Sequence, residues 1–441
     1  MNSHMTSSFT KRQNPVNFNR LNRFLSMNLP NKTLWVEGGL NMQEIAKKTL
    51  DFGLIPAVLP EFKEITVAGA VMGAALESAS FKHGQFSDQC LAYELVLEDG
   101  QNIICSEADY ADLFHGVSGS YGSLAKLSAA KIRLKKTKPY VRIDYELLAD
   151  QSKLWPLKDF HKIDYLDALV FESGETILSK AKAVGIKEIP YGLEGFNRLA
   201  ANWYIQNIEK KVLNGEIYTE YWTLFEYLFR YDLSAFWMGQ FTTSSPLRYL
   251  FPLGKNSLKK HLITAFEKYP PSISPSFLFR LFCNWKLSSR SLYKALHKFL
   301  GKDLEDLFII QDFYIPSPKI EEFLDFVERE IKIYPLWLCP VKSSKKAQIL
   351  SPHFLQERAT LPQFTNVGIY GRPQKRKDIK GLHKELEKIA LGLGGRKMLY
   401  GKNYYSKEDF WKIYDKKSYN SLREKYVPEK RFEDFYHRTC S

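Results

Sequence analysis

The stretch Thr66–Gly84, TVAGAVMGAALESASFKHG, carries the strongest structural signal in this chain. After Thr66, nine of the next ten residues are Gly, Ala, Val or Met. Side chains this small let a backbone approach a flat or charged ligand closely, as a loop whose N–H groups face phosphate oxygens. The same composition also lets a helix or strand pack tightly, so the stretch alone leaves both interpretations open.

A β-hairpin is expected directly after this stretch. Apolar residues alternate between Leu91 and Leu97, an Asp99-Gly100 turn follows, and Ile103 and Ile104 belong to the return strand. Residues 111–134, ADLFHGVSGSYGSLAKLSAAKIRL, then predict a short helix, a Gly/Ser turn at Gly119–Gly122 and another strand. The hairpin and the turn place the small-residue stretch inside a mixed α and β unit.

The order of these pieces resembles the flavin domain of the vanillyl-alcohol-oxidase superfamily of FAD enzymes. Within that superfamily the chain looks closest to the Δ24-sterol reductases, flavoproteins that reduce a side-chain double bond of sterols. Further matching pieces follow in the same order to the C-terminus: SFLFRLF, IIQDFYIP, IYPLWLCP, VGIYGRP and MLYGKNYYSKEDFWKIYDKKSYNSLREKY. The resemblance implies a PCMH-type FAD-binding domain whose first βαβ lobe is shortened or missing in this chain.

Length and pattern predict two domains of α+β class. A chain of 441 residues is too long for one ordinary hydrophobic core. After Lys138-Pro139, segments such as YVRIDYELL, FIIQDFYIP and FTNVGIYG predict strands, with helices between them, which indicates an α+β cap with an antiparallel sheet. We expect residues 1–138 to form the FAD-binding domain and 139–377 the substrate-binding cap, while 378–441 return to the FAD domain.

The formal net charge of +14 favours acidic partners. Lysine and arginine are dispersed, and no helix-turn-helix, zinc-finger or aromatic RNA-binding signature is present, so nucleic acid is not expected. The acidic partners left are NADPH, with its extra phosphate, and the surface of an acidic membrane.

Cysteine usage and hydropathy favour a cytoplasmic protein. The five cysteines lie far apart without Cys-x-x-Cys spacing, which argues against a disulfide framework or a metal site: Cys90, Cys105, Cys283, Cys339 and Cys440. The nine histidines show no metal-ligand clustering, so no metal is expected. Neither an apolar signal core nor an apolar run of membrane-spanning length is visible. Peripheral contact with a membrane stays an open alternative.

The resemblance implies FAD as the cofactor and NADPH as its reductant. Superfamily members that attach FAD to histidine do so from the lobe that is missing here, so noncovalent FAD is expected. A partner chain that supplies the missing lobe is a further open alternative. The cofactor-binding residues expected are Thr66, Val67, Ala68, Gly69, Ala70, Val71, Gly73, Glu77, Ser78, Ser80, Lys82, His83, Gly119, Ser120, Gly122 and Ile132.

Catalytic and substrate-binding candidates complete the expected site. Tyr400 is the candidate proton donor, Lys402 could stabilise the anionic reduced flavin by its charge, and Glu77 is the third catalytic candidate. The substrate-binding candidates lie on predicted cap strands or in the C-terminal piece: Gln311, Tyr314, Trp337, Tyr370 and Asn403. For the aromatic ones, a packing role in the core is the competing interpretation.

The resemblance implies an FAD-dependent oxidoreductase in which reduced flavin passes hydride to a carbon–carbon double bond of a sterol-like or polyprenyl lipid. Two alternatives stay open. The same flavin fold could oxidise an alcohol on a sugar or lipid, because a fold does not fix the direction of a reaction. A chain without its first lobe could also be a flavin-free homologue that acts as a binding or partner protein.

Overall fold

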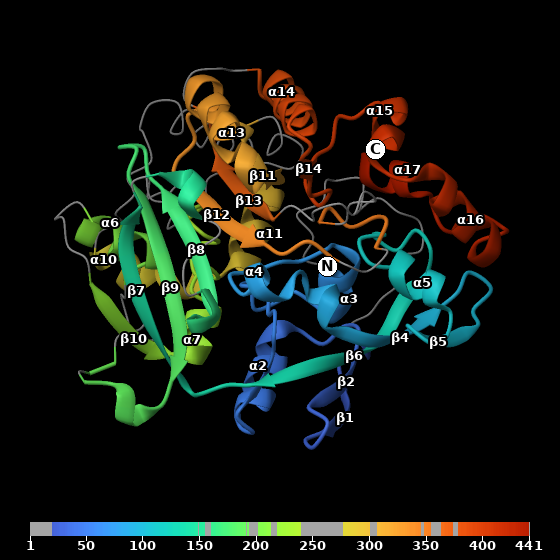
Figure 1. The fold of residues 1–441 in the computed structure, drawn as a ribbon, viewed down its shortest axis with the longest axis horizontal. Coiled ribbons are helices and arrows are strands. Elements are labelled where there is room, and N and C mark those ends of the chain that lie inside the picture. Colours follow the sequence, from blue (N-terminus) through green and yellow to red (C-terminus); the bar gives the residue numbers. More distant parts are fainter. Residues whose placement is uncertain are drawn as a thin grey trace.

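Two antiparallel β-sheets with helices packed around them form the molecule (Figure 1). The computed structural model describes residues 20–148, 150–154, 160–190, 192–193, 202–212, 218–239, 277–299, 307–344, 348–353, 363–373 and 378–440. This mixture of helices and antiparallel sheets confirms the predicted α+β class.

The first sheet has six strands, in the order β1-β2-β6-β4-β5, with β3 also paired to β6. Its central strand β6 alternates buried and more exposed residues in its second half, which gives the sheet one face toward the core. The predicted Asp-Gly hairpin is present as β4 and β5. The strands are β1 Phe24–Asn28, β2 Thr33–Glu37, β3 Leu54–Pro56, β4 Cys90–Val96, β5 Asn102–Ser106 and β6 Lys126–Lys136.

The second sheet has eight strands, in the order β10-β7-β9-β8-β12-β13-β11-β14. Strands β8, β12 and β13 are buried along their whole length, because elements cover both faces of the sheet there. The strands are β7 Tyr140–Leu148, β8 Tyr165–Val170, β9 Thr176–Val184, β10 Thr219–Thr223, β11 Ile309–Pro316, β12 Leu336–Val341, β13 Phe364–Gly371 and β14 Arg396–Lys397.

The helices are mostly short and lie around the two sheets (Figure 1). The α-helices are α2 Met42–Leu50, α3 Val67–Met72, α4 Ser80–His83, α5 Ala111–Gly116, α6 Tyr204–Val212, α7 Leu224–Leu228, α10 Phe277–Cys283, α11 Ser289–Phe299, α13 Ile320–Phe326, α14 Ile379–Gly392, α15 Lys407–Ile413, α16 Lys416–Tyr426 and α17 Phe435–Cys440. The short helical turns are η2 Phe86–Gln89, η3 Gln151–Leu154, η4 Phe160–Lys162, η5 Ile186–Glu188, η7 Asn284–Lys286, η8 Ser317–Lys319 and η9 Val327–Ile331.

The C-terminal residues contact both sheets. Helix α14 packs on β11 and β14, so it lies with the second sheet. Further along, Arg423 on α16 donates to the carbonyl oxygen of Ser123 at 2.9 Å, and Tyr426 donates to Asp112 at 2.7 Å. Figure 1 shows α15, α16 and α17 beside α5 of the first unit. The chain therefore crosses from one sheet to the other after β14; the predicted boundary at residue 378 stays a prediction.

Candidate functional site

The small-residue stretch forms helix α3. Thr66 caps it, because its Oγ1 accepts a hydrogen bond from the N–H of Gly69 at 3.2 Å. The N–H groups of Val67 and Ala68 donate to the carbonyl oxygens of Leu40 and Gly38 at 3.0 and 2.8 Å. The first turn of α3 is therefore packed and is not an open loop. The N–H groups of Val67 and Ala68 are already taken up by protein carbonyl oxygens.

The end of α3 lies against the Gly/Ser turn at Gly119–Gly122. The N–H of Gly119 donates to the carbonyl oxygen of Val71 at 3.1 Å, and that of Tyr121 donates to Met72 at 3.0 Å. The Tyr121 hydroxyl also lies 3.4 Å from the carbonyl oxygen of Gly73. The structure therefore brings together two segments that the sequence assigned to one cofactor.

Only glycine fits the start of that turn. Gly119 has a φ of 72°, a region that side chains disfavour, and a Cβ there would lie 2.7 Å from the carbonyl oxygen of Leu350. Ser120 is fully buried behind it, and Gly122 repeats the positive φ at 74°. The turn is thus held close to the residues around Leu350.

The polar residues after α3 lie where the two sheets meet. We call this region the seam: residues 77–89 together with strands β11 and β12 of the second sheet. The N–H of Leu166 donates to the carbonyl oxygen of Ser78 at 2.7 Å, and that of Lys342 donates to Ser80 at 2.9 Å. The Ser80 hydroxyl accepts from the N–H of Glu77 at 3.0 Å. The first two bonds attach the segment after α3 to the second sheet, and the third stabilises its own turn.

Glu77 is a buried carboxyl group at the seam, with an exposed fraction of 2%. Burial raises its pKa from 4.5 to about 7, and a 2.9 Å hydrogen bond from the Ser78 hydroxyl partly offsets that rise. Glu61 is also buried, and its pKa is raised by burial and then by the charge of Glu77. Glu77 can therefore gain or lose a proton near neutral pH, as a general acid or base must.

Three other cofactor candidates are placed by protein contacts. The Lys82 ammonium donates to the carbonyl oxygens of His161, at 3.1 Å, and of Ile163. Burial lowers the pKa of His83 to about 4, so its ring is neutral at pH 7. Ile132 is fully buried in the middle of β6. None of these contacts includes the turn at Gly119, and the cofactor role of each stays a prediction.

Strand β11 supplies three polar side chains to the seam. Tyr314 accepts a 2.8 Å hydrogen bond from Nε2 of Gln85, and Gln311 donates from Nε2 to the carbonyl oxygen of Lys402 at 3.1 Å. Between them, Asp312 accepts hydrogen bonds from the hydroxyls of Tyr370, at 2.8 Å, and of Tyr400. Tyr370 of β13 and Tyr400 of the C-terminal segment therefore meet at Asp312, on strand β11.

Asp312 is a candidate functional residue that the sequence did not suggest. Burial raises its pKa, while hydrogen bonds from Tyr400, Asn366 and Tyr370 oppose that rise. The bond from Asn366 Nδ2 is 2.6 Å long. An acidic residue inside the apolar run FIIQDFYIP was the signal available in the sequence, because a charged group in a buried strand needs partners.

Trp337 and Tyr370 belong to a packed aromatic cluster. The ring of Phe236 lies 5.1 Å from that of Trp337 and 4.9 Å from that of Tyr370, between ring centres. Trp337 also donates from Nε1 to Asp167 at 3.1 Å, and Asp167 forms a buried ion pair with Arg230 at 2.8 Å. Both candidates therefore line the apolar interior beside the seam.

Lys402 and Asn403 are held through the backbone around them. The Lys402 carbonyl oxygen accepts from the buried ammonium of Lys397 as well as from Gln311. Asn403 donates from Nδ2 to the carbonyl oxygens of Leu399, Gly401 and Thr439, the last at 2.7 Å. These contacts shape the loop that carries Tyr400; the flavin-contacting role of the Lys402 side chain stays a prediction.

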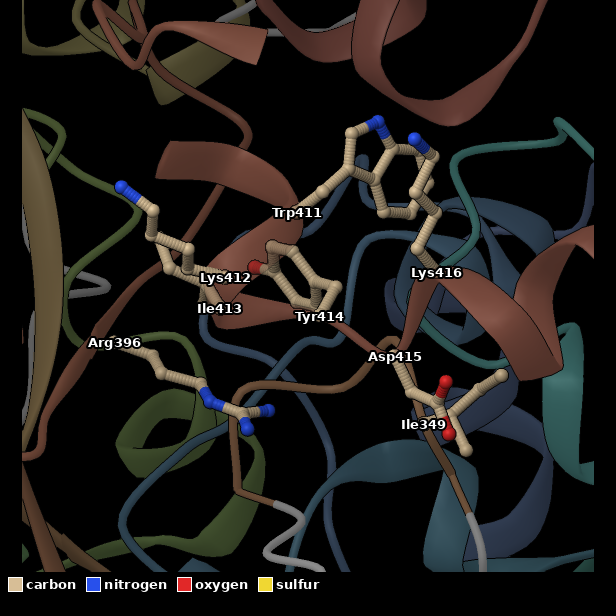
Figure 2. A pocket seen from close by; sticks show the side chains of 8 residues that line it. All are labelled: Ile349, Arg396, Trp411, Lys412, Ile413, Tyr414, Asp415 and Lys416. Carbon is tan, nitrogen blue, oxygen red and sulfur yellow. The ribbon is translucent and has the colours of Figure 1, made fainter. Parts of the chain in front are cut away.

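A cavity of about 280 Å³ opens beside this loop (Figure 2). Its lining residues are Ile349, Arg396, Trp411, Lys412, Ile413, Tyr414, Asp415 and Lys416. Arg396 donates to the carbonyl oxygen of Ser351 at 3.4 Å, and Ser351 bonds to Ser118 at 3.0 Å, next to the Gly119 turn. This volume is at the low end for small-molecule sites, so it could take only part of a dinucleotide.

The seam offers buried acceptors that suit a polar ring. Among the described residues, Glu77 Oε1, Gln85 Oε1 and Gln311 Oε1 are buried without a hydrogen-bond partner. Buried polar atoms are rarely left so, and a ligand or an ordered water would satisfy each of them. The isoalloxazine of FAD presents one N–H between two carbonyl groups, so one of these acceptors could bind that N–H, while the two ring carbonyl groups need donors from elsewhere. Across the described ranges, no helix is both long and apolar enough to span a membrane.

Comparison with known proteins agrees with this geometry. Residues 3–106 match the family described as an FAD binding domain. The chain is 29% identical to human Delta(24)-sterol reductase over 410 residues, which cover 92% of this chain and 73% of that protein. It is 26% identical to the Delta(24)-sterol reductase of Arabidopsis thaliana, over 96% of this chain and 76% of the relative.

A third match is shorter. Cytokinin dehydrogenase 5 of Arabidopsis thaliana is 30% identical over 142 residues, 31% of this chain and 26% of that protein. Together with the fold, these matches show that residues 3–106 resemble an FAD binding domain and that more than nine-tenths of the chain is similar to Δ24-sterol reductases. They support the resemblance to FAD-dependent oxidoreductases of the vanillyl-alcohol-oxidase superfamily. Residues 3–19 of the matched domain lie outside the described residues, so the shortened first lobe stays a prediction.

Proposed function

We propose that this chain binds FAD noncovalently along the seam and reduces a carbon–carbon double bond of an apolar lipid, sterol-like or polyprenyl, with NADPH as the reductant. The observation that supports this most is the hydrogen bond from the partly buried Tyr400 to the buried Asp312, beside the segments assigned to the flavin. Reduction of an alkene needs a proton as well as a hydride, and this pair can hold one.

When bound, FAD supplies the hydride to one alkene carbon. Tyr400 keeps its proton because burial, and then the negative charge of Asp312, raise the pKa of the phenol. Asp312 accepts the hydrogen bond of that phenol and so holds the Tyr400 oxygen in place, while Asn366 and Tyr370 hold the carboxylate. To donate its proton to the second alkene carbon, the Tyr400 O–H would turn from Asp312 toward the substrate.

Glu77 is the other residue that could move a proton. Its pKa of about 7 leaves both protonation states populated at neutral pH. It lies on the first-sheet side of the seam, whereas Tyr400 follows β14 of the second sheet. The two residues would therefore serve different sides of a ligand, and variants of each distinguish them.

The aromatic cluster supports an apolar substrate. Tyr370 joins the cluster to the proton pair, because its ring contacts Phe236 while its hydroxyl binds Asp312. Trp337 belongs to the same aromatic cluster, because its ring also contacts Phe236. An apolar lipid lying against these rings would bring its double bond toward Tyr400, which favours a lipid over a sugar.

Oxidation of an alcohol is the second candidate. The chain matches a protein named cytokinin dehydrogenase over less than a third of its length, and a dehydrogenase removes hydride from its substrate. A flavin-free binding protein is the third candidate, and a purified protein that neither contains nor takes up FAD would favour it.

The test is analysis of the product. Purified protein is incubated with FAD, NADPH and a sterol that has a side-chain double bond, and the sterols are examined by mass spectrometry. The proposal expects a product with two more hydrogens, one of them deuterium when the solvent is heavy water. Oxidation of an added alcohol with an unchanged alkene would overturn it.

A further inference from the structure

The cavity of about 280 Å³ has more positive than negative side chains in its lining (Figure 2). Its one acidic residue, Asp415, caps α16 by accepting from the N–H and the hydroxyl of Ser418, at 3.0 and 2.6 Å. The ammonium of Lys412 is paired with two acidic residues of its own helix. Arg396 and Lys416 are therefore the charges that the cavity offers to a ligand.

Arg396 is a partly buried cation without an acidic partner. Within the described residues its guanidinium contacts the carbonyl oxygen of Ser351, at 3.4 Å, and the ring of Tyr414, at 5.6 Å from the ring centre, and it forms no ion pair. Burial lowers the pKa of Arg396, whereas an anion bound beside it would favour the charged form. Arginine side chains withdrawn from water usually have an anionic partner, so this cation is placed for an anionic ligand.

Two further features of the cavity suit a nucleotide. Lys416 is the first of the eleven residues of α16, so the positive end of that helix dipole lies at the cavity. Trp411, also in the lining, is partly exposed, and its ring packs on that of Tyr419 at 5.2 Å between ring centres. An indole ring can stack on a nucleobase, while the helix start and the cations attract a phosphate.

The cavity lies close to the turn assigned to the flavin. Ser351, whose carbonyl oxygen Arg396 contacts, bonds through its hydroxyl to Ser118 at 3.0 Å, and Ser118 directly precedes Gly119. The volume takes a phosphate with its sugar but not a whole dinucleotide. The rest of a dinucleotide held here would therefore extend outside the cavity, with the flavin turn close by.

We infer that this cavity binds the 2′-phosphate of NADPH through Arg396, with Lys416 adding positive charge at its rim. A phosphate monoester carries about −1.5 to −2 charges at neutral pH, and arginine binds its oxygens by charge-assisted hydrogen bonds. NADH lacks this phosphate, so the two residues would select NADPH over NADH. The choice of NADPH rests on the proposed function, because the cavity itself indicates only a phosphate group.

Equilibrium binding to the purified protein, loaded with FAD, tests the site without the reaction. Adenosine 2′,5′-bisphosphate should bind more tightly than adenosine 5′-monophosphate, and its binding should weaken as salt rises. R396M should weaken binding of the bisphosphate about tenfold or more, and R396K should restore part of it. K416M should weaken it less, because Lys416 is exposed. The matched control is K417M, which changes the next exposed lysine, outside the cavity lining, and should bind like the parent.

Reduction of the flavin separates this inference from the proposed function. R396M should raise the NADPH concentration that gives half-maximal reduction and leave that of NADH unchanged. If the bisphosphate binds as expected but NADPH does not reduce the flavin, the phosphate site is supported and the reductant in the proposed function is wrong. The inference is overturned if the bisphosphate binds no better than the monophosphate, or if K416M and K417M behave alike. It is also overturned if inorganic phosphate displaces the bisphosphate at equal concentration, or if R396M releases FAD, which would assign Arg396 to the cofactor.

Discussion

Gln85 donates from Nε2 to the hydroxyl of Tyr314 at 2.8 Å, and both side chains are fully buried. This bond joins the segment that follows helix α3 to strand β11 of the second sheet. It therefore links the segments assigned to the cofactor to the second sheet, so a change at either residue should affect both.

The Y314F variant should lower the free energy of unfolding by about 1–3 kcal/mol, because Gln85 would be left with a buried, unpaired donor. Urea unfolding followed by circular dichroism measures this. Tyr110, half exposed on the surface, provides the control variant Y110F, which should leave the free energy unchanged. Equal stability of parent and Y314F would show that the bond does not join the units.

Tyr400 and Tyr370 both donate a hydroxyl to Asp312, but only Tyr400 is assigned the proton. Y400F should slow the reoxidation of reduced flavin by the alkene about 10²–10⁴-fold, the usual contribution of a general acid. Reduction of the flavin by NADPH should be unchanged. Stopped-flow absorbance measures both half-reactions.

Y370F is the matched control for this prediction. Like Y400F, it removes one hydrogen-bond donor from Asp312, so both variants should lower the free energy of unfolding by about 1–3 kcal/mol. Y370F should slow reoxidation of the flavin by the alkene much less than Y400F does. Equal slowing by the two variants would mean that Tyr400 acts only by holding Asp312.

Gly69 should be required for FAD retention. A Cβ at this position would meet only the Thr66 Oγ1, at 3.2 Å, so G69L should keep the protein folded while its side chain projects from the helix assigned to the flavin. The expected result is loss of bound FAD with little change in melting temperature. Gly192, whose Cβ would meet nothing within 4 Å, gives the control G192L. Unchanged flavin content in G69L would remove α3 from the cofactor site.

Stability should depend on pH through Glu77. The folded protein holds this proton to about pH 7, whereas the unfolded chain loses it near pH 4.5, so the folded state binds more protons between these values. The stabilisation is complete below about pH 4.5 and is lost as the pH rises to 7, a change of about 3 kcal/mol. The amide side chain in E77Q does not titrate, so this fall in the free energy of unfolding between about pH 4.5 and 7 should be absent from the variant.

The measurement is the difference in free energy of unfolding between the parent and E77Q at several pH values. His83 acts in the opposite direction in the same window, because its lowered pKa makes the folded state bind fewer protons. His83 is present in both proteins and cancels in the difference. Glu61 does not cancel, because the charge of Glu77 raises its pKa, so the difference reports Glu77 together with its effect on Glu61. A difference independent of pH would contradict a raised pKa at this carboxyl.

Local pattern predicted much of the fold. The Asp99-Gly100 hairpin and strands such as Tyr140–Leu148 and Phe364–Gly371 lie where alternation and apolar runs placed them. Helix α14 begins at Ile379, where Asp378 caps it by accepting from the N–H of Gly381 at 2.8 Å. A cap residue is a weaker sequence signal than periodicity.

The candidate site was harder to predict than the fold, because the residues that bond to one another there are far apart in the sequence. Asp312 and Tyr400 are separated by 88 residues, and Gln85 and Tyr314 by 229. Composition around Thr66, taken alone, favoured tight packing over ligand contact, and the bonds to Leu40 and Gly38 show that the first turn of α3 is packed. Pairing across the seam follows from the arrangement of the sheets, which no local pattern encodes.

The most direct test of this account is the absorption spectrum of the purified protein, recorded under anaerobic conditions in a single titration. The account predicts flavin bands that are released into solution on denaturation, that bleach with NADPH, and that return when a sterol with a side-chain double bond is added. A protein that stays colourless after incubation with FAD, or whose bleached flavin is reoxidised only by oxygen, would contradict it.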